Sequence, residues 1–197
     1  LFRQGEGPGE VNAARDMALL DDGRVGVIQE FPGKMVLVDR DGLPAGVCQP
    51  GGDDPSRGGV VSLTACTAGH GLIVMTGTEF PERDAPGVQK RINFLASFSP
   101  EGKELARFAA NETEYDFNDF VFAEREHMPN FWWGAAVGSD GNVYAAPQRQ
   151  PYAIHVWRPD GTPARVIERA YEPYQRTAAD QAFLKGGVGR QPGHLAL

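Results

Sequence analysis

Short apolar runs alternate with turn-forming pairs along most of the chain. The pairs are Asp22-Gly23, Asp41-Gly42, His70-Gly71, Glu101-Gly102, Asp140-Gly141 and Asp160-Gly161. Pairs of this kind between apolar runs favour tight hairpins, because glycine adopts positive φ without a steric clash. The intervening runs are short, rich in β-branched and aromatic residues, and bounded by Gly, Pro or Asp. They therefore predict β-strands.

The predicted strands fall into three groups, each with two of these turns. The first group is Ala14–Leu20, Arg24–Glu30, Lys34–Arg40 and Leu43–Gln49. The second is Val60–Ala68, Leu72–Phe80, Arg91–Phe98 and Lys103–Ala109. The third is Phe131–Ser139, Asn142–Pro147, Ala153–Arg158 and Thr162–Tyr171. The second turns begin at residues 41, 101 and 160, a spacing of 60 and then 59 residues, which indicates a repeat.

Four-stranded antiparallel units in tandem predict the blades of a β-propeller. Met35–Val38 is apolar at successive positions, as expected of a strand that is buried on both faces between neighbouring blades. We therefore expect an all-β fold, a single propeller domain or fragment over residues 1–197, with blades at about 14–49, 60–109 and 131–171. In the tail, 172–197, a short helix is expected at Thr177–Lys185, with Thr177 as N-cap and Gly186-Gly187 as its end. An open β-sandwich is the competing fold.

The motifs also resemble a known family. "GEGPGEV" at Gly5–Val11 leads into "ALLDDGRVGV" and "KMVLVDRDG", and "GSDGNVYAA" and "YAIHVWRPDGTPARVI" follow later. These segments resemble the six-bladed propellers of the NHL-repeat and related bacterial type, over roughly Gly5 to Tyr171. The resemblance implies a six-bladed ring, of which three blades and part of a fourth are visible here. It implies little about activity, because this fold supports ligases, lactonases, lyases and pure binding proteins.

Two long segments interrupt the strand pattern, Pro81–Lys90 and Asn111–Asn130. In a propeller, both connections would project from the same face. Long loops on a rigid scaffold are common places for binding. We therefore expect insertions 81–90 and 111–130 to form one surface.

The composition of the second insertion suggests a protein partner. Its six acidic residues accompany one arginine and four aromatic residues, and Phe131, Trp132 and Trp133 follow. Exposed aromatic residues at this density indicate an interface, although the rings could instead pack onto the propeller while the carboxylates face outward. One of the two tryptophan rings is expected to pack between blades. The candidate partner-binding residues are Tyr115, Phe117, Asp119, Phe120, Phe122, Glu124, Glu126 and Trp132.

Composition and charge narrow the classes of partner. The 197 residues carry a net charge of −7, which argues against a surface for nucleic acid. The sequence has no apolar run long enough to span a membrane. It opens "LFRQGEGPGE", without Met or a signal-peptide pattern, so we expect a piece or processed form of something longer. The resemblance implies a periplasmic or secreted location.

Motifs for chemistry are weak. Cys48 and Cys66 have no metal-ligand spacing, and we expect two free thiols on neighbouring blades. The residues 116–127 include several oxygen ligands and His127 but no calcium loop or zinc pattern. His155 is expected to be a packed strand residue, and neither a nucleophile motif nor a phosphate loop is recognisable. No catalytic residue, metal or cofactor is expected.

These observations predict a non-catalytic propeller that binds another protein through the face carrying the two insertions. It would be an extrinsic periplasmic or secreted subunit, within a larger membrane-associated complex. The alternative is a metal-dependent propeller enzyme of the lactonase or lyase type. A metal ion on the propeller axis, bound by several blades, would distinguish this alternative.

Overall fold

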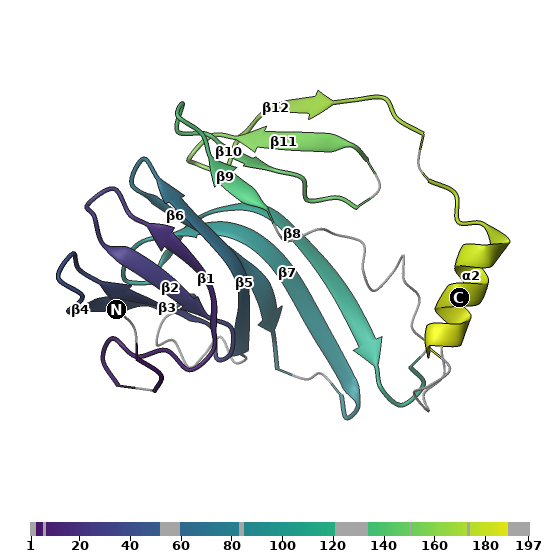
Figure 1. Cartoon of the computed structure of the whole chain (residues 1–197), viewed down its shortest axis with the longest axis horizontal. Coiled ribbons are helices and arrows are strands. Elements are labelled where there is room, and N and C mark those ends of the chain that lie inside the picture. The colour runs from purple at the N-terminus through teal and green to yellow at the C-terminus, as the bar shows by residue number, and fades with distance from the viewer. Residues whose placement is uncertain are drawn as a thin grey trace.

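The residues that the structure describes form three four-stranded antiparallel sheets and one short helix (Figure 1). The structure, a computed structural model, describes residues 3–5, 7–51, 60–82, 85–120, 134–149, 151–172 and 174–188. The predicted all-β class is confirmed, and the three sheets have the strand order of propeller blades. The predicted groups 14–49, 60–109 and 131–171 correspond to one sheet each.

Each sheet is a meander in which sequential strands are neighbours. Blade one contains β1 (Ala14–Leu19), β2 (Val25–Gln29), β3 (Lys34–Val38) and β4 (Pro44–Cys48). Blade two contains β5 (Val60–Gly69), β6 (Leu72–Phe80), β7 (Val88–Phe98) and β8 (Glu104–Asp116). Blade three contains β9 (Ala135–Val137), β10 (Val143–Ala145), β11 (Ala153–Trp157) and β12 (Pro163–Glu168).

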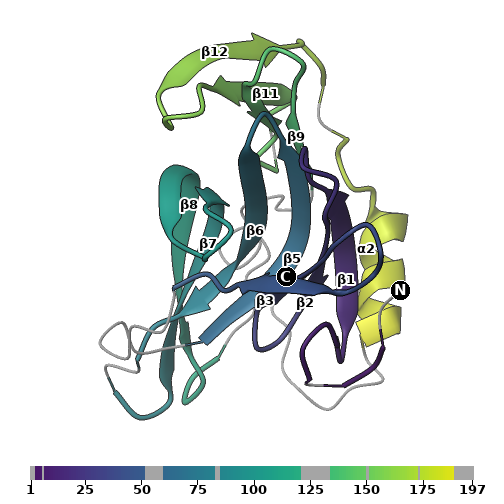
Figure 2. The same cartoon turned by 90° about the vertical axis from the view of Figure 1, so that its left-hand side faces the viewer.

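The blades are arranged around their first strands. β1 lies beside β5, and β5 lies beside β9, so the first strands of successive blades are neighbours in space. Figure 2 shows the first two blades with β1 next to β5, and blade three above them. This arrangement makes the first strand the inner one and the fourth strand the outer one in each blade.

The predicted turns form because glycine takes a backbone conformation that other residues rarely adopt. The glycines of the six turns have φ between 76° and 88°. Five of the turns are closed by backbone hydrogen bonds. In each, the residue two positions before the acidic residue donates its N–H to the carbonyl of the residue that follows the glycine. For example, Leu20 N–H donates to Arg24 O at 2.8 Å, and Gly23 N–H donates to Leu20 O at 2.9 Å. The His70-Gly71 turn is shorter, and His70 has φ 50°, as in a two-residue hairpin.

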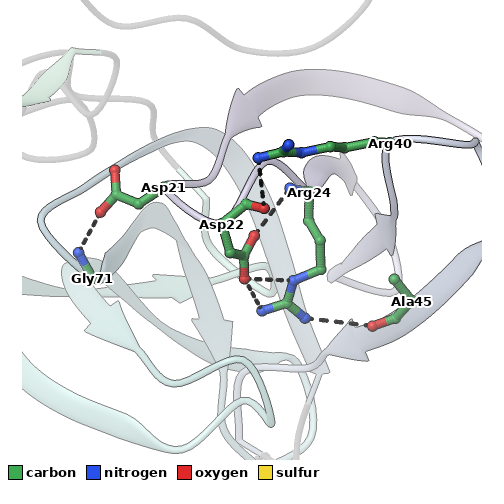
Figure 3. Close-up of polar contacts among 6 residues, drawn as sticks. All are labelled: Asp21, Asp22, Arg24, Arg40, Ala45 and Gly71. Carbon is green, nitrogen blue, oxygen red and sulfur yellow. Dashed lines mark hydrogen bonds and ion pairs between the residues drawn. The ribbon is translucent and has the colours of Figure 1, made fainter.

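Acidic side chains reinforce these turns. Asp22 accepts hydrogen bonds from the Arg24 side chain at 2.8 Å and from its backbone N–H at 3.0 Å (Figure 3). These bonds to the charged form hold the pKa of Asp22 below its ordinary value. Asp21 Oδ2 accepts a 2.6 Å bond from Gly71 N–H, which connects the first turn of blade one to the first turn of blade two.

Two apolar cores lie between the blades. The core between blades one and two is formed by Leu20, Ile28, Met35, Leu37, Cys48, Leu63, Ile73, Met75, Phe94, Ala96 and Phe98. The core between blades two and three is formed by Val74, Leu95, Ala106, Phe108, Val143, Ala145 and Trp157. Side chains of β6 and β7 alternate between the two, because successive residues of a strand point to opposite faces. Blade two is therefore buried on both faces.

The same strand positions form the core at each junction. In each blade, the residue two positions after the glycine of the first turn begins or lies near the start of the second strand and pairs with a residue of the third strand. These pairs are Val25 with Val38, Ile73 with Phe98, and Val143 with Trp157. The pair in blade two packs toward blade one, and the pair in blade three packs toward blade two. The equivalent positions of blade one face away from blade two, where Val11 packs against Val27 and Val36.

The C-terminal helix is longer than predicted. α2 spans Ala178–Val188 and lies apart from the sheets in Figure 1. Thr177 is its N-cap, since Thr177 Oγ1 accepts from Asp180 N–H at 3.2 Å and Asp180 Oδ2 accepts from Thr177 N–H at 2.7 Å. The prediction that Gly186-Gly187 ends the helix is wrong, because the helix continues to Val188.

Both cysteines are free thiols, as predicted. Cys48 belongs to the core between blades one and two, and Cys66 packs against the same core. Burial raises the pKa of each thiol to about 12, because a thiolate is poorly solvated there. The nearby Asp16 carboxylate also raises the pKa of Cys66.

Truncation of Phe98 tests the packing between blades one and two. Phe98 is 2% exposed, so Phe98→Ala should lower the free energy of unfolding by about 3–5 kcal/mol. Leu105→Ala is the matched control, because Leu105 is 53% exposed, and it should change stability by less than about 0.5 kcal/mol. The measurement is chemical denaturation of both variants. Equal stability of the two would contradict the blade packing described here.

The thiols give a second test. The folded protein should not react with a thiol-specific disulfide reagent at pH 8, whereas both thiols should react once the chain is denatured. The folded pKa lies above the unfolded value of 9.0, so the thiol contribution to stability is complete below pH 9. That contribution is lost as pH rises toward 12. Cys66→Ala should flatten the alkaline fall in melting temperature, and rapid labelling of the folded protein would contradict the burial.

Candidate functional site

The predicted insertions are partly a long β-hairpin. β7 begins at Val88 and β8 continues to Asp116, whereas the sequence predicted that the strands begin at Arg91 and end at Ala109. β6 pairs with β7 as far as Glu79 opposite Ile92. Beyond this point, residues 88–91 of β7 pair with residues 113–116 of β8, and no other described strand pairs with either segment. We call this two-stranded extension the distal ribbon; β7 and β8 project beyond β5 and β6 in Figure 1.

The ends of the two predicted insertions are held together. Phe117 N–H donates to Gly87 O at 2.8 Å, and Asn118 Nδ2 donates to Pro86 O at 3.2 Å. Asp116 Oδ1 accepts from Asn118 N–H at 2.9 Å, which fixes the turn after β8. The described parts of segments 81–90 and 111–130 therefore lie side by side, as predicted, although their connection is a strand pairing rather than two loops.

One face of β8 carries a row of exposed carboxylates. Glu112, Glu114 and Asp116 alternate with half-buried residues, so all three lie on the same face of the strand. Lys90 Nζ forms a long ion pair of 3.9 Å with Glu112. An exposed pair of this kind contributes little, so the strip is left with excess negative charge. We call Glu112, Glu114 and Asp116 the acidic strip.

The other side of the ribbon end carries an aromatic cluster. The rings of Tyr115 and Phe117 stack with centroids 6.2 Å apart, and Phe120 lies 5.8 Å from both. The Arg91 guanidinium lies 4.1 Å from the Tyr115 ring centroid, within the range of a cation–π contact. Phe117 is 51% exposed, so the cluster presents apolar surface to solvent. We define the aromatic cluster as Tyr115, Phe117 and Phe120.

The structure places half of the predicted partner-binding residues. Tyr115, Phe117, Asp119 and Phe120 lie together at the end of the distal ribbon, with Asp119 exposed. The other predicted residues, Phe122, Glu124, Glu126 and Trp132, lie outside the described residues, as does the expected packing of Trp132 and Trp133.

The sequence interpretation missed Arg91. It contacts the Tyr115 ring across the ribbon, and its guanidinium also lies 5.6 Å from the centroid of Phe80. Arg91 was predicted to begin a strand, without a role. Because Arg91 is paired with Thr113 across the hairpin, only the strand register brings it near Tyr115. No local sequence signal indicates this contact.

In the described part of the chain, no three His, Cys, Asp or Glu side chains gather closely enough to hold a metal ion. None of the described helices has the length and apolar character needed to cross a membrane.

The chain is distantly similar to solved structures, whereas the other two comparisons found no match. No family model matches the chain, and no curated protein matches it. Among solved structures, the chain is similar to one described as a streptogramin B lyase structure, with 13% identity and a TM-score of 0.34. The similarity covers 77% of this chain and 53% of that structure, so the chain spans about half of its length.

Proposed function

We propose that this protein is a non-catalytic interaction module that binds a protein partner through the distal ribbon. The observation that carries the proposal is the combination of exposed Phe117 with the acidic strip on one projecting hairpin. Interfaces use aromatic residues as anchors, and surrounding charges select the partner and accelerate association. The proposed partner therefore offers a basic surface with an apolar recess.

The charge balance of the ribbon supports a basic partner. Residues 88–91 contribute Lys90 and Arg91, whereas residues 112–119 contribute four carboxylates, so the net charge of these two segments is −2. Arg91 lies over the Tyr115 ring, which orients it toward the aromatic cluster. The acidic strip thus faces solvent with Lys90 as its nearby cation.

Charge reversal tests this interface. Glu114→Lys with Asp116→Lys should weaken partner binding by roughly tenfold or more. Raised salt concentration should also weaken partner binding by the unaltered protein. The matched control is Glu168→Lys with Glu172→Lys, which makes the same change in net charge at exposed positions of blade three and its tail. The measurement is quantitative co-purification from the native source, followed by affinity measurement with the recovered partner.

Phe117→Ser tests how much the exposed aromatic ring contributes to partner binding, because it leaves the charges of the acidic strip unchanged. We expect it to weaken binding by about 1–2 kcal/mol while the melting temperature is unchanged, because the side chain is exposed. Equal binding by the ribbon variants and the control pair would contradict the interface. It would favour the alternative, a metal-dependent lactonase- or lyase-type enzyme.

We also propose that the three blades belong to a closed ring of the six-bladed, NHL-like type. Leu19 lies on the free face of blade one and is 68% exposed. On the free face of blade three, Ile154 and Ile167 are cross-strand partners and are 41% and 44% exposed. Their equivalents in blade one, Met35 and Cys48, are fully buried against blade two. Further blades packed on these faces would bury the exposed apolar side chains in the same way.

Cysteine labelling tests ring closure. Leu19→Cys in the full-length protein should resist a maleimide, whereas Leu43→Cys, in an exposed turn, should react rapidly. Cys48 is buried and Cys66 is half-buried, and a pKa raised to about 12 keeps both thiols protonated, so they give little background. Rapid labelling at both positions would contradict a closed ring.

The proposed setting is periplasmic or secreted, as an extrinsic subunit of a larger membrane-associated complex. This proposed location is supported by the resemblance of the Gly5–Val11 segment and the turn motifs to NHL-repeat propellers. Fractionation of the native cells tests it, and recovery only with cytoplasmic markers would contradict it.

A further inference from the structure

A cavity of about 400 Å³ lies between blades two and three, on the face of β7 and β8 opposite the acidic strip. Its lining includes residues of β7 and β8 in blade two and of β10 and β11 in blade three. Leu95 and Phe108 from blade two and Ala145 from blade three contribute apolar lining. Its volume is within the range of small-ligand sites in proteins.

Aromatic rings form one wall of the cavity. His155 and Trp157 stack with their ring centroids 5.5 Å apart and nearly parallel planes, and Phe108 lies 6.1 Å from Trp157. Trp157 and Phe108 are largely buried in the core between the blades, so the wall is fixed in position. His155, at a position occupied by Ala96 in blade two and Val36 in blade one, is half-buried and lines the cavity.

Blade two contributes two side-chain amides to the lining, Asn93 and Asn111. Asn93 and Asn111 are directly opposed across β7 and β8, which places both side chains on the same face. Asn93 Oδ1 accepts a 2.7 Å hydrogen bond from Thr78 Oγ1, and Asn111 Nδ2 donates a 3.2 Å bond to Thr113 Oγ1. Among the described residues, Asn93 Nδ2 and Asn111 Oδ1 have no hydrogen-bond partner. Asn93 and Asn111 therefore offer one donor group and one acceptor group at the cavity wall.

We propose that this cavity binds a neutral, polyhydroxylated ligand, such as a sugar ring. Hydroxyl groups both donate and accept, so they match the adjacent Asn93 donor and Asn111 acceptor. The apolar face of a sugar ring would pack against the aromatic wall. His155 is the only ionisable side chain among the described lining residues, so a charged ligand would find no fixed ion there. The inference goes beyond the proposed protein interface, because no described lining residue of the cavity belongs to the acidic strip or to the aromatic cluster.

Ligand-observed saturation-transfer NMR tests the proposal. The probes are methyl α-glucopyranoside, methyl β-galactopyranoside and N-acetylglucosamine, each at millimolar concentration. We expect at least one probe to bind and to shift the indole N–H resonance of Trp157, which is assigned from the spectrum of Trp157→Phe. Failure of all three sugars to bind, or binding without a shift of that resonance, would overturn the proposal.

Amide variants locate the binding site. Asn93→Leu should weaken sugar binding roughly tenfold, since it leaves the ligand hydroxyl without its partner. Asn111→Ala is the second variant, should Asn93→Leu fail to fold. Asn118→Ala is the matched control, because Asn118 is an exposed amide at the ribbon turn. Unchanged affinity in a folded Asn93 or Asn111 variant would overturn the site. The Glu114→Lys and Asp116→Lys pair should leave sugar binding unchanged, so failure of the protein interface and failure of this site can be distinguished.

Discussion

The packing of one blade against the next is the interaction on which the rest of the structure depends. Each sheet is small, and strands of three residues such as β9 and β10 have little stability alone. Phe98 and Trp157 fill equivalent places at the two junctions, and each is at most 6% exposed. These cores hold β7 and β8 in register, and both the distal ribbon and the cavity between blades are built on those two strands.

Local chemistry explains why the three sheets could be predicted from sequence. An acidic-Gly pair fixes a turn within four or five residues, through positive φ at the glycine and through bonds such as Leu20 N–H to Arg24 O. Each turn then joins two consecutive apolar runs, which pair as neighbouring antiparallel strands. The first and third connections of all three sheets follow from these turns, with no information from distant residues. The end of α2 was predicted less well, because a glycine pair permits a helix end without imposing one.

The candidate site could not be predicted from local sequence in the same way, because it depends on which residues of β7 and β8 pair. Residues 111–116, Asn-Glu-Thr-Glu-Tyr-Asp, contain no apolar alternation and were interpreted as a loop. They form a strand because each pairs with a residue of β7, as in Tyr115 opposite Gln89. The period-two alternation of charged and uncharged residues was the available signal. The contact of Arg91 with Tyr115, and the opposition of Asn93 and Asn111, require the register itself.

That register also explains how one hairpin can carry two unlike surfaces. Successive side chains of a strand point to opposite faces, so the even positions of β8 from 112 to 116 present carboxylates. The odd positions present Asn111 near the cavity and Tyr115 near Arg91. A substitution at an even position changes the charge facing solvent and leaves the amide pair in place. The acidic strip and the amide pair on this hairpin are therefore separable by residue parity, since the strand backbone holds the two faces apart.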